Sequence, residues 1–349
     1  MKPFVTPLFA LGLLASTVVA AQPDDKRTPY QTKTFTGATA VRAETSGGSL
    51  SVEGGSGNET RVEMFVRGND WNGGNNALSK DELQKRLNDY DISIQKDGNT
   101  VVAIAKRKAS ADRNDWKRSL NISFKFYTPR QLAADLETSG GSLSLSHLIG
   151  NQKLETSGGS IRLDDVRGIV NGETSGGSIN ITNCHDQITL ETSGGSIEAT
   201  DSDGKLTLET SGGSIRLNGL KGNIVAETSG GSVQGGNIDG ELKATTSGGS
   251  VRLANIAGSL ETSTSAGSIE VAMTRVDKYV RIDGSVGTVR LTLPMNKGMN
   301  LDLRGNKVVS GSLVNFDGEA NKDRIRGKVN GGGPLVEVRA SSGTVYLNK

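Results

Sequence analysis

The chain has 349 residues, including 47 glycines, 7 phenylalanines, 5 tyrosines and one cysteine, and its 40 basic residues nearly balance 38 acidic ones. This balance argues against a dedicated nucleic-acid-binding protein, which would carry a strongly basic surface. The single cysteine excludes a framework of intrachain disulfides, and a glycine share about twice the usual one favours many tight turns around a thin aliphatic core.

The first 21 residues have the pattern of a secretory signal peptide. Lys2 precedes an apolar run from Leu8 to Ala21, which ends in small residues suited to a cut after Ala21. No later segment approaches the roughly 18 apolar residues of a membrane-spanning helix. We therefore predict that the mature chain is exported, to the periplasm or to the cell surface and beyond, without a transmembrane segment after cleavage.

Residues 22–135 are predicted to form a first coil and a capping insertion. The stretch ETSGGSL at 44–50 is the first copy of a motif that recurs later. Ser79-Lys80-Asp81-Glu82 has the spacing of a capping box, which predicts a short helix to about Tyr90. The alternating Ile122, Phe124 and Phe126 then bring the chain back towards the repeats. Since a solenoid must cover its open end, we expect a small cap here.

Residues 136–270 form a strict repeat. The motif ETSGGSI, or a close variant, starts at residues 137, 155, 173, 191, 209, 227, 245 and 263, always 18 residues apart. An invariant period without insertions is the signature of a solenoid. We number the positions of each repeat from 1 to 18, starting at the glutamate, and call them slots.

Within one repeat, apolar residues alternate with polar ones. Slots 7 and 9 are apolar, as in Ile161 and Leu163, and so mainly are slots 16 and 18, as in Leu206 and Leu208. This period of two is typical of strands with one buried face. Slot 14 is usually glycine, as in Gly168, which allows a positive φ at a corner. We predict an all-β fold, a single-stranded parallel β-helix (solenoid) with 18-residue coils and a small α+β N-terminal cap or insertion. Its handedness and the number of faces per coil stay open.

Stacking in register would align the glutamates of slot 1 in a column. Its six members in the array are Glu137, Glu155, Glu173, Glu191, Glu209 and Glu227. At the strand spacing of about 4.8 Å, adjacent carboxylates would repel by about 0.9 kcal/mol even in water. Solvent, backbone N–H groups of the Ser-Gly-Gly corner, or Arg162, Arg216 and Arg252 in slot 8 could offset this repulsion. The remaining interpretation is Ca²⁺ bridging successive coils.

The motifs of catalysis and of metal binding are missing from the sequence. The G-G-x-G-x-D-x-U-x pattern of calcium-loaded β-rolls, G-x-S-x-G and H-E-x-x-H do not occur. We therefore predict no catalytic residue, no cofactor and no metal site, with the six glutamates kept as surface candidates. His147 and His185 are expected in surface loops. Cys184 takes slot 12, where other repeats carry aliphatic residues, so we expect a small buried hydrophobe. The hydroxyls of the slot 2 threonines are expected to form hydrogen-bonded ladders that close the corner.

Residues 271–349 are predicted to form irregular C-terminal coils and a cap. Their Gly-Gly-Gly-Pro and Ser-Ser-Gly-Thr-Val segments, the ETSGGSI copies and the strand before Pro129 together resemble a bacterial family of exported β-strand-repeat proteins called "putative adhesins". The resemblance covers nearly the whole mature chain and implies a β-helix, but it fixes no partner. Many members carry Asp after the glycines, where this chain has Ser160, Ser178 and Ser196, which weakens the metal interpretation further.

These patterns predict a non-enzymatic, exported β-solenoid that acts in adhesion or in the cell envelope and presents ladders of Glu, Thr and Ser. A glycan, an envelope component or another protein is the expected partner, and nucleic acid is not; the oligomeric state stays open. The alternatives are a carbohydrate-active β-helix enzyme and a cation-binding β-helix that uses the glutamate column. Enzymes on β-helices generally carry long loops that build a cleft, and the regular repeats here have none.

Overall fold

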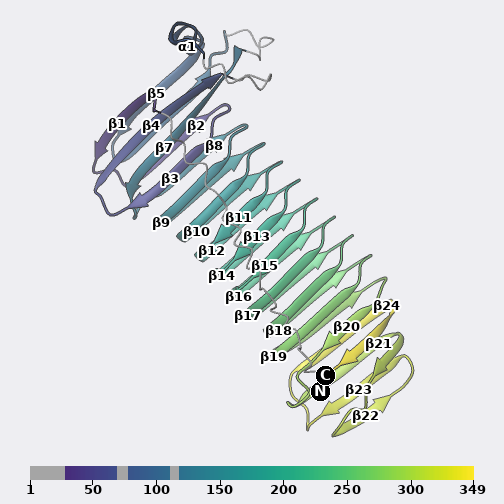
Figure 1. The fold of residues 1–349 in the computed structure, drawn as a ribbon. Helices are drawn as coiled ribbons and strands as arrows, with labels where there is room; N and C mark the ends of the chain where they lie inside the picture. The colour runs from purple at the N-terminus through teal and green to yellow at the C-terminus, as the bar shows by residue number, and fades with distance from the viewer. Residues whose placement is uncertain (1–27, 69–77, 111–117) are drawn as a thin grey trace, which may run out of the picture.

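A computed structural model describes residues 28–68, 78–110 and 118–349, and the structural statements below concern these residues. They form 24 strands and a single helix. Figure 1 shows a long stack of coils with a broader group of strands at each end. The predicted all-β, solenoid-like fold is confirmed. The predicted signal peptide at residues 1–21 lies outside the described residues.

The central strands repeat along the stack. They are β8 (Ala133–Thr138), β9 (Leu143–Thr156), β10 (Ile161–Thr174), β11 (Ile179–Thr182), β12 (His185–Thr192), β13 (Ile197–Thr200), β14 (Asp203–Thr210), β15 (Ile215–Asn218), β16 (Lys221–Thr228), β17 (Val233–Thr246) and β18 (Val251–Thr264). Each pairs in parallel with the equivalent strand one coil away, so Ile161 lies opposite Ile179 and Ile197 opposite Ile215. The 18-residue period of the sequence is therefore the register of the sheet.

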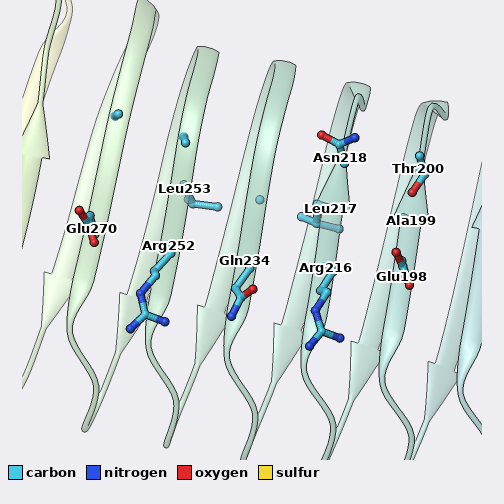
Figure 2. Close-up of a pocket in the computed structure, with 13 residues that line it drawn as sticks. Glu198, Ala199, Thr200, Arg216, Leu217, Asn218, Gln234, Arg252, Leu253 and Glu270 are labelled. Carbon is cyan, nitrogen blue, oxygen red and sulfur yellow. The ribbon is translucent and has the colours of Figure 1, made fainter. Parts of the chain in front are cut away.

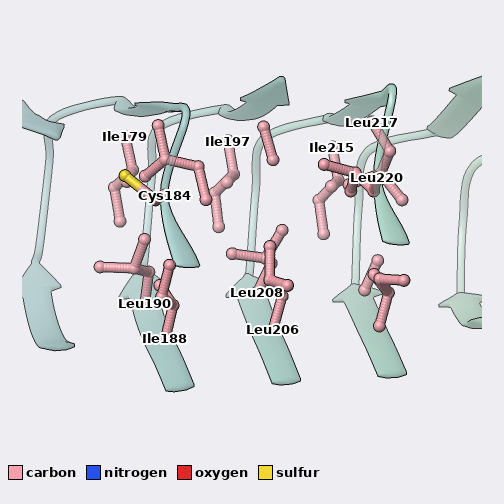
Figure 3. Packing of buried hydrophobic residues seen from close by; sticks show 14 of the residues in the cluster. Ile179, Cys184, Ile188, Leu190, Ile197, Leu206, Leu208, Ile215, Leu217 and Leu220 are labelled. Atoms are coloured by element: carbon pink, nitrogen blue, oxygen red, sulfur yellow. The ribbon is translucent and has the colours of Figure 1, made fainter. Parts of the chain in front are cut away.

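Each coil has two strand faces. The short face runs through slots 7–10, as in β11, β13 and β15, and the long face runs from about slot 13 to slot 2 of the next repeat, as in β12, β14 and β16. Their inward residues meet in a thin aliphatic core, where Ile179 and Ile197 lie across from Ile188 and Leu190 (Figure 3). Cys184 lies in the same core and is fully buried, as predicted.

The chain bends between the short and the long face at slots 11 and 14. Slot 14 has a positive φ and is glycine in all regular coils except one, where Asp186 has a φ of 80°. Slot 11 is a second bend that the sequence analysis did not recognise. It also has a positive φ in seven successive coils, and its residues are His147, Asp165, Asn183, Asp201, Gly219, Asn237 and Asn255. Asn, Asp and Gly tolerate this left-handed conformation best, so their recurrence in slot 11 was the missed signal.

The N-terminal end contains β1 (Gln31–Thr36), β2 (Ala40–Thr45), β3 (Leu50–Gly55), β4 (Glu59–Gly68), α1 (Lys80–Leu87), β5 (Tyr90–Asp97), β6 (Thr100–Arg107) and β7 (Leu120–Pro129). The early motif copy stacks directly on the array, because β2 pairs with β8 and β3 with β9. Strands β6 and β7 return on the other side of β2 and β3, and β5 and β4 pair antiparallel to them. The excursion therefore covers the open end of the stack, with Phe124 and Phe126 buried in it.

At the N-terminal end, the start of the helix is capped and the outer strands carry lysines. The side chain of Ser79 caps α1 by accepting a hydrogen bond from the N–H of Glu82, as the capping box predicts. At the outer strands, the ammonium of Lys33 on β1 donates to the carbonyl oxygen of Ile94 on β5, and that of Lys96 donates to the carbonyl oxygen of Thr36. Lysines at sheet edges discourage pairing with a further strand.

The C-terminal end contains β19 (Ile269–Gly284), β20 (Val289–Thr292), β21 (Met299–Ser310), β22 (Phe316–Ala320), β23 (Arg324–Val329) and β24 (Leu335–Asn348). The register shifts between β18 and β19, where the strict period of the sequence also ends. Strand β24 then completes the stack on β19 and β20, and β21 lies beyond β24. Strand β23 pairs antiparallel with β21 on one side and with β22 on the other. Both ends are therefore closed by a chain excursion.

Candidate functional site

The repeated motif forms the corner that joins the long face of one coil to the short face of the next. Thr192 shows the arrangement. Its buried hydroxyl accepts the N–H of Gly195 at 3.2 Å and donates to the carbonyl oxygen of Gly177, one coil back, at 2.8 Å. The same two bonds recur at Thr138, Thr156, Thr174, Thr210, Thr228, Thr246 and Thr264. The predicted closing role is confirmed. The predicted ladder of bonded hydroxyls, presented at the surface, is wrong for threonine, because each of these threonines is buried and bonds glycine backbone.

The second glycine of the corner has no room for a side chain. A Cβ on Gly195 would lie 2.0 Å from the carbonyl oxygen of Gly177, whereas a Cβ on Gly194 would lie 3.5 Å from its nearest neighbour. The sequence follows this difference, because Ala266 replaces the first glycine of a later copy while Gly267 keeps the second. The second glycine therefore serves the close approach of successive coils.

The serine of slot 6 also belongs to the architecture. The hydroxyl of Ser178 accepts the N–H of Ser196 at 3.3 Å, and the hydroxyl of Ser196 accepts the N–H of Ser214 at 3.2 Å. This ladder continues along the stack through Ser232 and Ser250. The threonine, the second glycine and the second serine of the motif are thus engaged in holding coils together.

The glutamates of slot 1 form the predicted column. Glu137, Glu155, Glu173, Glu191, Glu209 and Glu227 lie opposite one another in successive coils, and Glu44 precedes them. Lysines pair with the column towards its ends: Lys106 with Glu44, Lys153 with Glu155 at 3.9 Å, and Lys243 with Glu227 at 2.6 Å. The hydrogen bond to Glu227 raises the pKa of Lys243.

The middle of the column has no such partner. Among the described residues, Glu173, Glu191 and Glu209 form no ion pair, and their side chains are exposed to solvent. The slot 8 arginines do not reach them, because they lie on the short face, across the corner. Anywhere in residues 28–68, 78–110 and 118–349, no three His, Cys, Asp or Glu side chains are arranged to hold a metal ion. The calcium interpretation therefore gains no ligand set from this geometry.

A small polar hollow lies at the N-terminal end of the column. Its volume is about 250 Å³, and Glu44, Glu137, Glu155, Lys106 and Arg107 contribute to its lining. Threonine and serine side chains of the corner complete it. This is the place where the column comes closest to forming an enclosed site.

A larger hollow, the short-face trough, crosses five coils from residues 198–200 to residues 270–272. Its volume is about 580 Å³, and Figure 2 shows its lining. Slot 8 forms one side with Glu198, Arg216, Gln234, Arg252 and Glu270, which follow one another in register. Slot 10 forms the opposite side, with Thr200 and Asn218 at one end. The trough was not predicted from the sequence.

Small residues create the trough. Slot 10 holds Gly236, Ala254 and Ala272 in three successive coils, where earlier repeats carry Ser, Asp, Thr or Asn. Gly235 takes the inward slot 9, and the side chain of Leu253 fills the space beneath it, because a Cβ on Gly235 would lie 2.9 Å from the Leu253 Cδ2. The floor is therefore closed towards the core. The sequence signal that could have predicted the trough is Gly235-Gly236 in slots 9 and 10, where other repeats usually carry leucine and a polar residue.

Two arginines stand at the centre of the trough. Arg216 and Arg252 extend in the same direction on either side of Gln234 (Figure 2). They are two coils apart, or about 10 Å at the usual strand spacing. Both are exposed, and neither forms an ion pair within the described residues. In the slot 8 row, Glu198 lies beside Arg216 and Glu270 lies beside Arg252. The trough thus presents two unpaired guanidinium groups flanked by a carboxylate at each end.

The other titratable groups serve the architecture. His185 pairs with Asp203 at 3.0 Å, and His147 is exposed at a slot 11 bend, so both histidines lie at the surface as expected. They belong to strands β12 and β9, however, and not to the predicted loops. At the start of the irregular coils, Arg275 bridges Asp239 and Asp277 at 2.7 Å each and lowers the pKa of Asp277. The bond to Asp239 ties the shifted segment of β19 to the coil two positions earlier in the stack.

The one helix among the described residues, α1, has 8 residues and is too short and polar to cross a membrane.

The C-terminal third of the chain matches a family model. Residues 232–348 match the family described as Toastrack DUF4097. Over these residues, the match confirms the family resemblance inferred from the sequence. A search of the curated proteins finds no match.

Three solved structures are similar to the chain. A "putative cell adhesion protein" from Clostridium sporogenes is 10% identical, with 92% of this chain and 99% of that chain covered and a TM-score of 0.20. A "putative adhesin" from Bacteroides fragilis is 14% identical, with 75% and 96% covered and a TM-score of 0.31. A "putative lipid binding protein" from Parabacteroides distasonis is 16% identical, with 90% and 96% covered and a TM-score of 0.31. At these identities and TM-scores, the likeness says nothing about a ligand.

Proposed function

We propose that the chain is an exported, non-enzymatic β-solenoid that acts as an adhesin-like interaction protein of the bacterial envelope. The observation that carries this proposal is the use of the repeated motif. Its threonine, second glycine and second serine hold the coils together, which leaves a long, rigid array of outward side chains. A rigid surface loses little conformational entropy when it binds, so it suits contact with an extended partner. The signal-peptide pattern of residues 1–21 supports export.

The geometry of the trough favours binding over hydrolysis. Its two carboxylates, on Glu198 and Glu270, are four coils apart, or about 19 Å, whereas glycosidases place their two carboxyl groups about 5–9.5 Å apart. A partner lying in the trough would therefore contact both carboxylates without being cleaved between them.

Export and envelope binding can be tested in one series. The full-length chain is expressed in a bacterium, the cells are fractionated, and the N-terminus of the recovered protein is sequenced. The proposal predicts cleavage after Ala21, recovery outside the cytoplasm, and binding of the purified mature chain to isolated envelopes. Leu13→Arg, which interrupts the apolar run, should keep the protein inside. An uncleaved cytoplasmic wild type would contradict export, and a mature chain that ignores envelopes would contradict the interaction role.

The competing enzyme hypothesis rests on the polar hollow at Glu44, Glu137 and Glu155. Reducing-sugar release from envelope and plant polysaccharides tests it directly. Our proposal predicts no release by the wild type. Release that Glu155→Gln abolishes would instead establish a carbohydrate-active enzyme.

A further inference from the structure

We propose that the short-face trough binds a linear acidic polysaccharide, whose carboxylates pair with Arg216 and Arg252. This inference rests on the proposed envelope-interaction function and names the class of ligand. The two guanidinium groups are exposed and have no ion-pair partner within the described residues. Guanidinium is planar and always charged, and it binds carboxylates through two parallel hydrogen bonds. Two such groups, about 10 Å apart along one line, suit a chain that bears carboxylates at intervals.

The ends of the trough favour hydroxyl groups. Glu198 and Glu270 would repel an anionic group, but their oxygens accept hydrogen bonds from hydroxyls. The side chains of Gln234, Asn218 and Thr200 supply further donors and acceptors along the two sides. A chain whose units carry both carboxylates and hydroxyls therefore matches this lining better than a polyanion without hydroxyl groups does.

The floor of the trough excludes two other classes of partner. It is the face of a sheet whose backbone groups already pair between coils, so it cannot add a peptide strand as a sheet edge does. The lining contains no aromatic side chain. Single-stranded nucleic acid is bound largely by the stacking of its bases on aromatic side chains, which the trough does not provide. Small, flat surfaces at Gly236, Ala254 and Ala272 can instead accept the C–H face of a sugar ring.

The test uses the purified mature chain and oligomers of galacturonic acid, with binding measured by isothermal titration calorimetry. Arg216→Gln and Arg252→Gln should each weaken binding about tenfold, as expected for loss of one charge-assisted contact. Arg162→Gln is the matched control, because Arg162 occupies slot 8 on the same face but does not line the trough. The control should bind as the wild type does. Equal losses in all three variants would overturn the proposal, because they would indicate general charge attraction.

A second variant tests the shape without altering charge. Gly236→Asn introduces the residue that Asn218 supplies in the neighbouring coil, and a Cβ there would meet nothing closer than 3.8 Å. The variant should keep the melting temperature of the wild type and lose affinity for the oligomer, since its side chain occupies the trough. Unchanged affinity would overturn the proposed location.

The probe itself supplies the last comparison. Fully methyl-esterified galacturonate oligomers have the same chain without the negative charge, and we expect them not to bind. Equal binding of esterified and free oligomers, or no binding of either, would overturn the inference. A mature chain that binds envelopes but not galacturonate would leave the proposed function intact. A chain that binds galacturonate but is never exported would support the inferred ligand and contradict the proposed function.

Discussion

At the corner, the same threonine and glycine recur in coil after coil with the same two hydrogen bonds, whereas slot 8 of the short face changes at every step from Glu198 to Glu270. Both regions belong to the same coils and have the same backbone register. The corner is uniform because each coil must approach the next within backbone contact distance. Outward positions on the short face are free of that requirement. In this solenoid, strict repetition therefore marks architecture, and departure from repetition marks the place where a ligand is expected.

The largest expected effect comes from the second glycine of the corner. Gly195→Ala places a Cβ 2.0 Å from a backbone oxygen of the preceding coil, which no side-chain movement can relieve. We expect a loss of at least about 4 kcal/mol in the free energy of unfolding. Gly194→Ala is the matched control and should cost little, because its nearest neighbour would be 3.5 Å away. Urea denaturation measures both; similar losses would show that the two glycines have one common role.

Removing the corner hydroxyl should have the next largest effect. Thr192→Val keeps the shape of the side chain but leaves the N–H of Gly195 and the carbonyl of Gly177 without this partner. We expect a loss of about 3 kcal/mol, since two buried backbone groups are affected. Ser193→Ala, one residue along, changes an exposed hydroxyl and should be nearly neutral. Comparable stability of the two variants in urea would contradict the assigned role of the threonine.

The buried thiol predicts a pH dependence that the corner does not have. Burial raises the pKa of Cys184 to about 11 from an ordinary value of 9.0. Because the folded state keeps the proton longer than the unfolded state, stability is fully present below pH 9 and is lost as the pH rises to about 11. The two-unit difference in pKa corresponds to about 3 kcal/mol of unfolding free energy.

Cys184→Val isolates this contribution. Valine is the residue at the same slot in the preceding repeat, Val166, so the core packing should be retained. The difference in unfolding free energy between wild type and variant should change between pH 9 and 11 and be constant from pH 6 to 8. Parallel curves over the whole range would show that the thiol is not held neutral by burial.

The smallest effect is expected in the glutamate column. Glu191→Gln removes a charge between Glu173 and Glu209 and should raise stability by less than about 1 kcal/mol at low salt, with the gain lost at high salt. Millimolar Ca²⁺ should leave the melting temperature of the wild type unmoved. A Ca²⁺-dependent rise that Glu191→Gln abolishes would establish the cation site instead. Glu198→Gln, on the short face, controls for a general change in charge.

Much of the fold could be predicted because an 18-residue period can be satisfied by only one register. The corner was recognised from its glycines, but the second glycine is not required there for the usual conformational reason. Gly195 is needed for the close approach of Gly177 rather than for a positive φ, and a contact between coils cannot be read from one repeat. The bend at slot 11 was readable from its Asn and Asp residues and was missed.

The candidate site was harder to predict, for two physical reasons. Two partners of the glutamate column, Lys153 and Lys243, come from slot 17 of the same face. The third, Lys106, belongs to the N-terminal excursion, and its pairing with Glu44, 62 residues earlier, depends on the folded cap. The trough exists because side chains are small at Gly235, Ala254 and Ala272, and a hollow appears only once the coils are stacked. The loss of larger side chains at a few positions is harder to recognise in a sequence than a motif that repeats in every coil.

The most direct test of the division between corner and short face is a crystal structure of the mature chain soaked with a short galacturonic acid oligomer. We expect difference density along the trough, with carboxylates at Arg216 and Arg252 and no density along the glutamates of the corner. Density on the glutamate column, or in the hollow at Glu44 and Glu155, would contradict it.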